Sequence, residues 1–163
     1  NKVFYLKKIF NKINYGKIQK MNLHTPEVSE FSAVIAKELK VRKIIKMFQK
    51  KYVKQKKTIV LEGRDMSKIF HNADVKFFVV CKPIKIAAKR RWLQLNKGKK
   101  NISFNQVLKD LKKRDFMDRN RKHSPLERDQ ESVYINTAKL NIKAVLDKMS
   151  KIVGKKLKDK YGS

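Results

Sequence analysis

The chain alternates between stretches with helical and with strand-like hydrophobic patterns. Short continuous apolar runs lack alternation, as strands buried on both faces of a parallel sheet do; they occupy Thr58–Glu62, Val75–Val80 and Ser132–Asn136. Around them, apolar residues recur three and four positions apart and predict helices. These helices begin near Thr25, run from about Val41 to Val53 and from Pro83 to Leu95, and follow Ser103 and Asn141. Strands that alternate with helices indicate an α/β domain with a parallel sheet.

The helix starts carry residues that suit their capping positions. Thr25 fits an N-cap and Pro26 the first helical position, while Ser103 and Gln106 form a capping box. Asn141 caps the last helix. We expect that helix to turn a set of apolar residues inward, namely Ile142, Val145, Leu146, Met149 and Ile152.

The two ends of the chain are less regular. The first 23 residues have no clean period, and Asn14–Lys17 is typical of a tight turn between strands. We expect Lys155–Ser163 to be a frayed basic tail.

The net charge of +29 is the compositional feature that bears most on function. Such a charge ordinarily suggests a nucleic-acid partner, but the lysines spread from Lys2 to Lys160 instead of gathering in one patch. Lysine is a point charge that solvates almost any helix face, whereas arginine offers a planar fork for phosphate or carboxylate groups. The charge alone therefore does not indicate a dedicated RNA-binding surface.

Other compositional features exclude several kinds of site. The single cysteine, Cys81, excludes an internal disulfide and is expected to be a buried, inert thiol. The three histidines are dispersed and have no metal-ligand spacing. No apolar run of about 18 residues and no signal peptide occurs, so we expect a cytoplasmic protein without a membrane partner.

One arginine-rich stretch places opposite charges on a single face. On a helix, Arg114, Asp118 and Arg121 lie at i, i+4 and i+7, so they project from the same side. Two guanidinium groups that flank one carboxylate can hold an anion and read a polar base edge, although a solvated ladder of ion pairs has the same spacing. A second polar cluster, Glu62–Asp65, follows the apolar run that begins at Thr58.

Several motifs occur in the order found in one enzyme family. They are Thr25–Val28 (Thr-x-Glu-Val), Lys40–Arg42 (x-Val-Arg), Glu62–Asp65 (Asp/Glu-Gly-Arg-Asp), Asn72–Phe78 (Asp-Ala-x-x-Lys-x-Phe), the pair Arg90–Arg91, and Arg114–Pro125 (Arg-Asp-x-x-Asp-Arg-Asn-Arg-x-x-x-Pro). From about residue 14 to residue 153 the chain thereby resembles cytidylate kinase, the bacterial family that phosphorylates CMP and dCMP with ATP. Every arginine except Arg128 lies in these motifs.

The resemblance implies an α/β fold with a parallel sheet, of the P-loop nucleoside monophosphate kinase type. Residues 1–56 would form an insertion-like region that binds the nucleoside monophosphate, residues 57–154 the core and lid, and residues 155–163 the basic tail. The resemblance also implies a monomer that uses ATP with Mg²⁺.

Roles for phosphate-binding residues follow from the resemblance position by position. Arg64 and Arg114 would hold the CMP phosphate, and Asp65 belongs to the same substrate-binding set. Arg91 would reach the transferring phosphates from the lid. Arg91 and Arg114 are therefore the catalytic candidates, because phosphoryl transfer mainly requires positioning and neutralisation of phosphate charge.

The resemblance likewise assigns the base-reading residues. Arg42 and Asp118 would read cytosine, the carboxylate accepting from the exocyclic amine and the guanidinium donating to ring acceptors. Arg121 would support this site. Two roles stay open for Glu62: it lies near magnesium-bound water, or it is a carboxylate that pairs with Arg64.

Three positions depart from the family pattern, and each could weaken binding without changing the fold. Ala33 stands where a serine usually contacts cytosine, and Ser32 lies about 100° away around the helix. His24 stands where an arginine is common. The turn after Asp65 lacks the usual glycine.

The sequence contains no Gly-x-x-x-x-Gly-Lys-Ser/Thr, the loop whose N–H groups cradle the phosphates of ATP. We therefore expect the chain to correspond to the C-terminal two-thirds of such a kinase, without the family's first strand, P-loop and following helix, and to have no kinase activity by itself. Two alternatives stay open: a basic RNA- or ribosome-associated binding module, and a structural remnant without activity.

Overall fold

The computed structural model describes most of the chain from Thr25 onward. The described residues are 25–35, 38–97 and 101–162, together with Phe4, Lys8, Ile9, Lys12, Lys20, Met21 and Leu23. They group into two compact units, residues 1–62 and 63–163. The predicted turn at Asn14–Lys17 and the position of His24 lie outside the described residues.

The first unit contains the helices α3 (Pro26–Ile35) and α4 (Leu39–Lys54). The N–H of Val28 donates to the Thr25 hydroxyl at 3.3 Å, which confirms the predicted N-cap. Ile44 is the buried residue of α4, but Phe31 of α3 is 65% exposed within the described structure. Both predicted helices are thus present.

The strand predicted at Thr58–Glu62 is wrong for this structure. Thr58 is a bend and residues 59–62 have no regular secondary structure, and Val60 is 97% exposed. An apolar run becomes a strand only when a neighbouring strand satisfies its backbone N–H and C=O groups. Among the described residues, the only paired strands lie in the second unit.

The second unit is organised around a two-stranded parallel sheet. Strand β1 (Phe77–Val80) pairs with β2 (Val133–Asn136), with Phe77 opposite Val133 and Val80 opposite Asn136. The β2 residue Ile135 is fully buried. Two of the predicted strands and their parallel pairing are therefore confirmed, with bounds one or two residues shorter at the amino ends.

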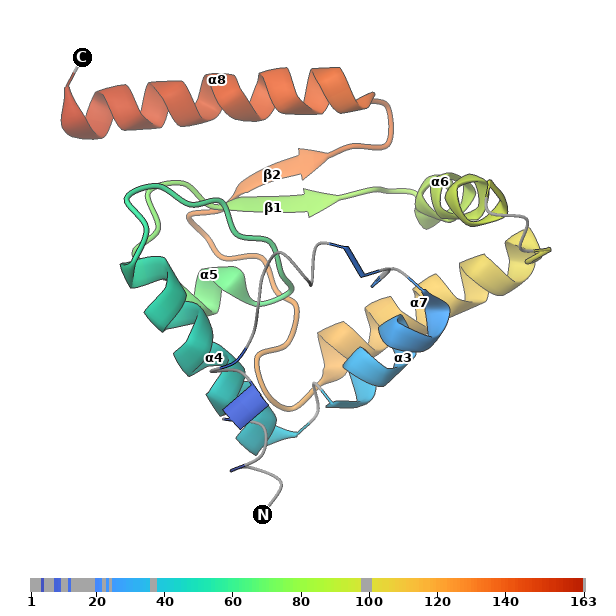
Figure 1. Cartoon of the computed structure of the whole chain (residues 1–163). Helices are drawn as coiled ribbons and strands as arrows, with labels where there is room; N and C mark the ends of the chain where they lie inside the picture. The colour runs from blue at the N-terminus through green and yellow to red at the C-terminus, as the bar shows by residue number, and fades with distance from the viewer. Residues whose placement is uncertain are drawn as a thin grey trace. The chain divides into compact units, whose positions relative to one another are not determined.

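Helices α6 (Ile84–Asn96) and α7 (Phe104–Asn120) pack against each other after β1 (Figure 1). Trp92 Nε1 donates to the Ile102 carbonyl at 2.9 Å, and the Asn96 amide both donates to that carbonyl and accepts from the Ile102 N–H. These bonds hold the end of α6 to the start of α7. Both helices confirm the sequence pattern.

The predicted capping box at Ser103 forms only in part. The Ser103 hydroxyl accepts from the Gln106 N–H at 3.1 Å, as an N-cap should. The Gln106 side chain donates to Asp110 Oδ1 at 2.7 Å instead of returning to Ser103. This bond to a charged acceptor turns the Gln106 amide forward along the helix, away from the Ser103 N–H from which its Oε1 would accept, so the reciprocal half of the box is not made.

A short helix, α5 (Met66–Ile69), follows the Gly-Arg-Asp turn and was not predicted. Four residues are too few for a helical period to be read. Ile69 is buried, and a Cβ on Gly63 would lie 2.8 Å from Cε of Met66. Glycine at this position thus lets the Met66 side chain lie over the turn that carries Arg64.

The last helix, α8 (Ile142–Tyr161), confirms the Asn141 cap, whose Oδ1 accepts from the Ala144 N–H at 2.8 Å. Two details of the prediction are wrong. Ile142 and Leu146, expected to face inward, are 80% and 58% exposed. The inward-facing side lies nearer Val145, which is half-buried.

The frayed tail predicted from Lys155 is also wrong, because α8 continues to Tyr161. Asp74, before β1, accepts hydrogen bonds from Lys160 Nζ and, at 2.8 Å, from the Tyr161 hydroxyl. These bonds lower the pKa of the Asp74 carboxyl and raise the pKa of the Lys160 ammonium. A long-range charge pair therefore holds the end of the helix, which local composition does not reveal.

Candidate functional site

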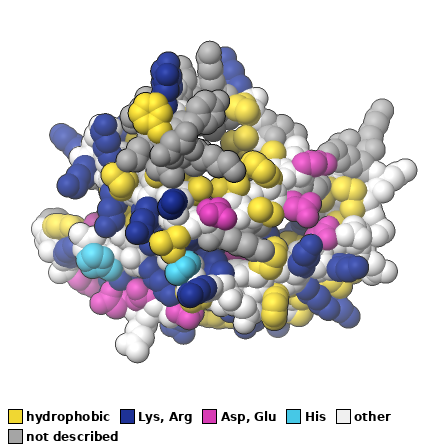
Figure 2. Space-filling model, turned by 90° about the horizontal axis from the view of Figure 1, so that it is seen from below, with side chains coloured by type: hydrophobic (Ala, Val, Ile, Leu, Met, Phe, Trp, Pro, Cys, Tyr) yellow, Lys and Arg dark blue, Asp and Glu magenta, His cyan; other side chains and the backbone are white. Residues whose placement is uncertain are grey.

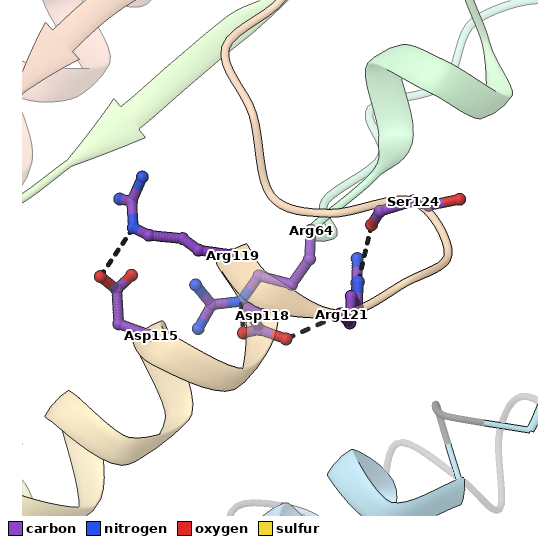
Figure 3. A network of polar contacts seen from close by, with 6 residues as sticks. All are labelled: Arg64, Asp115, Asp118, Arg119, Arg121 and Ser124. Atoms are coloured by element: carbon purple, nitrogen blue, oxygen red, sulfur yellow. Dashed lines mark hydrogen bonds and ion pairs between the residues drawn. The ribbon is translucent and has the colours of Figure 1, made fainter.

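Asp118 joins the two polar clusters that are far apart in sequence. Its Oδ2 lies 3.3 Å from Arg64 Nε, and its Oδ1 lies 3.4 Å from Arg121 Nη1 (Figure 3). The Asp118 and Arg121 side chains are only 14% and 12% exposed, whereas Arg64 is 42% exposed. The Gly-Arg-Asp turn and the end of α7 thus meet at one carboxylate.

The chain reverses direction directly after α7, and this turn fixes Arg121. Arg121 Nε donates to the Ser124 carbonyl at 2.6 Å, and Ser124 has a left-handed backbone with φ of 51°. The Leu126 N–H then donates to the Asp118 carbonyl at 2.8 Å. Asp118 is therefore held through its backbone as well as its side chain, and Arg121 contacts its carboxylate from the turn.

Arg114 lies one helical turn before Asp118, half-buried, in a strongly positive environment. Burial lowers the pKa of its guanidinium, and the nearby positive charges of Arg64 and Arg91 lower it further. The Asp118 carboxylate acts in the opposite direction. We refer to Arg64, Arg91, Arg114 and Asp118 as the arginine cluster. Three guanidinium groups and one carboxylate give the cluster a net positive charge, which favours the binding of an anion.

Another ion pair on α7 stays outside the cluster. Arg119 Nε lies 2.8 Å from Asp115 Oδ2, at i, i+4, with about 40% of each side chain exposed (Figure 3). This pair is the solvated ladder that helical spacing alone would suggest. Asp118 differs, because its partner Arg64 comes from a distant part of the sequence.

Asp118 Oδ2 is able to accept a hydrogen bond from a ligand in the arginine cluster. The atom is buried and makes no hydrogen bond to any of the described residues. Its contact with Arg64 Nε is an ion pair at 3.3 Å without hydrogen-bond geometry. A buried carboxylate oxygen of this kind is stabilised by an N–H donor from a ligand.

The other predicted site residues lie on α6, directly before α5, and in the first unit. Arg91 lies on α6, where its Nη1 donates to Gln94 Oε1 at 2.9 Å, and Asp65 directly precedes α5. Arg42 is half-buried on α4 and Glu62 is exposed, both in the first unit. The structure joins Arg64, Asp118 and Arg121 by direct contacts, and the charges of Arg64, Asp118 and Arg91 act on Arg114. The binding roles of all the predicted site residues, including Arg42 and Glu62, stay predictions.

A contact that the sequence did not predict also joins the segment after the Gly-Arg-Asp turn to the segment after α7. Lys68 Nζ of α5 lies 2.7 Å from Glu127 Oε2, in the segment after α7. These residues are 59 positions apart, and neither carries a motif that would suggest the pairing. The contact strengthens the connection between the turn with Arg64 and the end of α7.

The described residues contain no group of three or more His, Cys, Asp or Glu side chains able to hold a metal ion. Within the same residues, no helix is both long and apolar enough to cross a membrane.

A parallel α/β framework with a convergent arginine cluster is typical of proteins that bind phosphorylated small molecules. The cytidylate kinase family model matches residues 5–155. The chain is 35% identical to a cytidylate kinase of Clostridium botulinum (strain Loch Maree / Type A3), over 82% of this chain and 59% of that protein. It is 32% identical to a cytidylate kinase of Thermosipho melanesiensis, over 83% and 62% of the two chains.

The chain therefore belongs to the cytidylate kinase family. It spans about three fifths of the length of these curated relatives. The family implies the P-loop nucleoside monophosphate kinase fold, and the helix-rich structure with its small parallel sheet is consistent with that fold.

Proposed function

We propose that the chain carries the acceptor side of a nucleoside monophosphate kinase. In the proposed reaction, the γ-phosphoryl group of ATP is transferred to a phosphate oxygen of CMP or dCMP, which yields ADP and the nucleoside diphosphate. Family membership supports the reaction, and the arginine cluster supports the assignment of the acceptor site. The proposal places the protein, as a monomer, in cytoplasmic pyrimidine nucleotide metabolism.

The positive environment of Arg114 is the observation that carries the proposal. Neighbouring positive charges disfavour its charged form, so a bound phosphate relieves an existing repulsion as well as adding new hydrogen bonds. We assign the acceptor phosphate to Arg64 and Arg114, with Asp65 beside Arg64. Arg91 adds charge from α6 and stabilises the phosphoryl group in transit.

Asp118 is the proposed reader of the base. Its buried Oδ2 can accept from the exocyclic amine of cytosine, a donor that uracil lacks. Arg121 holds the carboxylate in place through Oδ1. Arg42 is the second proposed base contact, assigned by the family motif alone.

The donor side of the reaction is assigned only in outline. ATP would bring Mg²⁺ on its phosphates, because proteins usually bind this ion through one or two carboxylates together with substrate phosphates. Glu62 is the candidate for such a carboxylate through water, and its pairing with Arg64 is the alternative. We assign no direct metal ligand.

The alternative of a basic RNA-associated module has less support. Figure 2 shows Lys and Arg side chains in separate groups on the viewed face, interrupted by acidic and apolar side chains. Nothing in the family match points to RNA. A diffuse lysine coat predicts weak, sequence-independent affinity that salt removes.

Calorimetric titration of the chain with CMP, UMP, cytidine and an oligoribonucleotide distinguishes binding of a cytidine nucleotide from binding of RNA. We expect CMP to bind more tightly than UMP and cytidine, and the CMP preference to persist when the salt concentration rises. Binding of the oligoribonucleotide should fall steeply with salt. An oligoribonucleotide complex that persists at high salt, with no preference for CMP over UMP, would contradict the proposal.

A further inference from the structure

Arg90, on α6, makes several main-chain contacts that the proposed phosphate and base sites do not explain. Its Nη2 lies 2.9 Å from the Thr137 carbonyl, 3.2 Å from the Ala138 carbonyl and 3.0 Å from the Leu140 carbonyl. This nitrogen carries two hydrogens for three acceptors, so at least one hydrogen is shared between two carbonyls. A single guanidinium thereby binds three main-chain carbonyls of the connection between β2 and α8.

The start of α6 is tied to the same connection. The Asn136 amide accepts from the Lys82 N–H and donates to the Lys82 carbonyl, both at 3.0 Å. The Thr137 N–H donates to the Val80 carbonyl at 2.8 Å. The segment that leads into α6 is thus fixed at the carboxyl ends of both strands.

Arg91 lies between two anchored neighbours. Arg90 on one side binds the connection after β2, and Trp92 on the other binds the Ile102 carbonyl before α7. Consecutive helical residues point about 100° apart, so fixing both neighbours fixes the direction in which Arg91 leaves the helix. Arg91 then contributes positive charge at Arg114 on the adjoining helix α7.

We propose that Arg90 is a positioning residue, which sets the rotation of α6 and thereby aims Arg91 at the phosphate held by Arg64 and Arg114. The inference rests on the proposed function, because the phosphate is the ligand assigned there. Arg90 itself does not touch the nucleotide. Its Nη2 is bound by three main-chain carbonyls, and its Nη1 lies 3.9 Å from Cys81 Sγ.

The test compares variants of the full chain in their affinity for CMP and for cytidine, which lacks the phosphate. We expect Arg90→Ala to weaken CMP binding about tenfold, equivalent to roughly 1.4 kcal/mol, and to leave cytidine binding unchanged. Arg90→Lys keeps the charge but loses the planar fork, so it should recover only part of the affinity. It also provides a folded variant if Arg90→Ala does not fold.

Arg128 offers a matched control. Its Nε and Nη2 also donate to one main-chain carbonyl, that of Ser132, at 3.3 and 3.2 Å, and it is not part of the arginine cluster. Arg128→Ala therefore removes a similar contact at the amino end of β2. We expect it to leave the ratio of CMP to cytidine affinity unchanged.

A double-mutant cycle with Arg91→Ala gives the decisive readout. If Arg90 acts through Arg91, then Arg90→Ala causes no further loss of CMP affinity once Arg91 is alanine. Independent losses that add, or equal losses for CMP and cytidine, would overturn the inference while leaving the proposed function intact. A native chain that does not bind CMP would overturn the proposed function itself, and the inference with it.

Discussion

Replacing Arg114 with alanine is expected to weaken CMP binding about a hundredfold. Hydrogen bonds to charged groups contribute roughly 1.5–3 kcal/mol, and about 1.4 kcal/mol corresponds to a factor of ten. Arg114 is half-buried beside two like charges, so the loss of its direct contact dominates over the relief of repulsion in the free protein. Titration calorimetry of Arg114→Ala and the native chain measures the ratio of affinities.

Arg119→Ala is the matched control, because it removes a guanidinium from the same helix. Arg119 pairs with Asp115 on a partly exposed face, outside the arginine cluster. Its removal should leave CMP binding unchanged and cost at most about 0.5 kcal/mol of folding stability. If Arg119→Ala weakened CMP binding as much as Arg114→Ala does, bulk charge rather than a specific phosphate contact would explain the affinity.

Asp118→Asn is expected to narrow the preference for CMP over UMP. Cytosine presents an amine where uracil presents a carbonyl, so a buried carboxylate accepts from the first and repels the second. The mismatch should cost roughly 1–3 kcal/mol, or about one to two decades in affinity. An asparagine amide can turn its donor toward uracil and so reduces the difference.

The ratio of CMP to UMP affinity is the appropriate measurement for this variant. Loss of the Asp118 charge also leaves Arg64 and Arg121 uncompensated, which strengthens phosphate binding for both nucleotides. That common effect cancels in the ratio. Asp115→Asn on the same helix is the control, and an unaltered ratio in Asp118→Asn would make Asp118 a partner of the arginines only.

Elements with local signals could be predicted from the sequence. Ser103 and Asn141 mark helix starts because a short polar side chain satisfies an N–H group of the first turn, and both caps form. The apolar runs within Val75–Val80 and Ser132–Asn136 became the paired strands. The placement of Arg114 and Asp118 one turn apart on one helix also followed from spacing alone. The same spacing placed Arg121 on that helix, which is wrong, because α7 ends at Asn120 and Arg121, with an extended backbone, reaches Asp118 from the turn.

Features that depend on distant partners could not be predicted. Thr58–Glu62 has the composition of a strand, but no strand pairs with it among the described residues. Lys155–Tyr161 has the composition of a frayed tail, yet Asp74 holds its end. The ion pair between Arg64 and Asp118 joins motifs that no local pattern connects, and only the fold reveals it.

The central claim is that Arg64 and Arg114 bind the phosphate of a cytidine nucleotide beside Asp118. The most direct measurement is an NMR titration of the arginine Nε–H resonances with CMP and with cytidine. The account predicts that the Arg64 and Arg114 resonances shift with CMP and much less with cytidine, while those of Arg119 and Arg128 stay in place. Equal shifts at all four arginines, or none at Arg64 and Arg114, would contradict it.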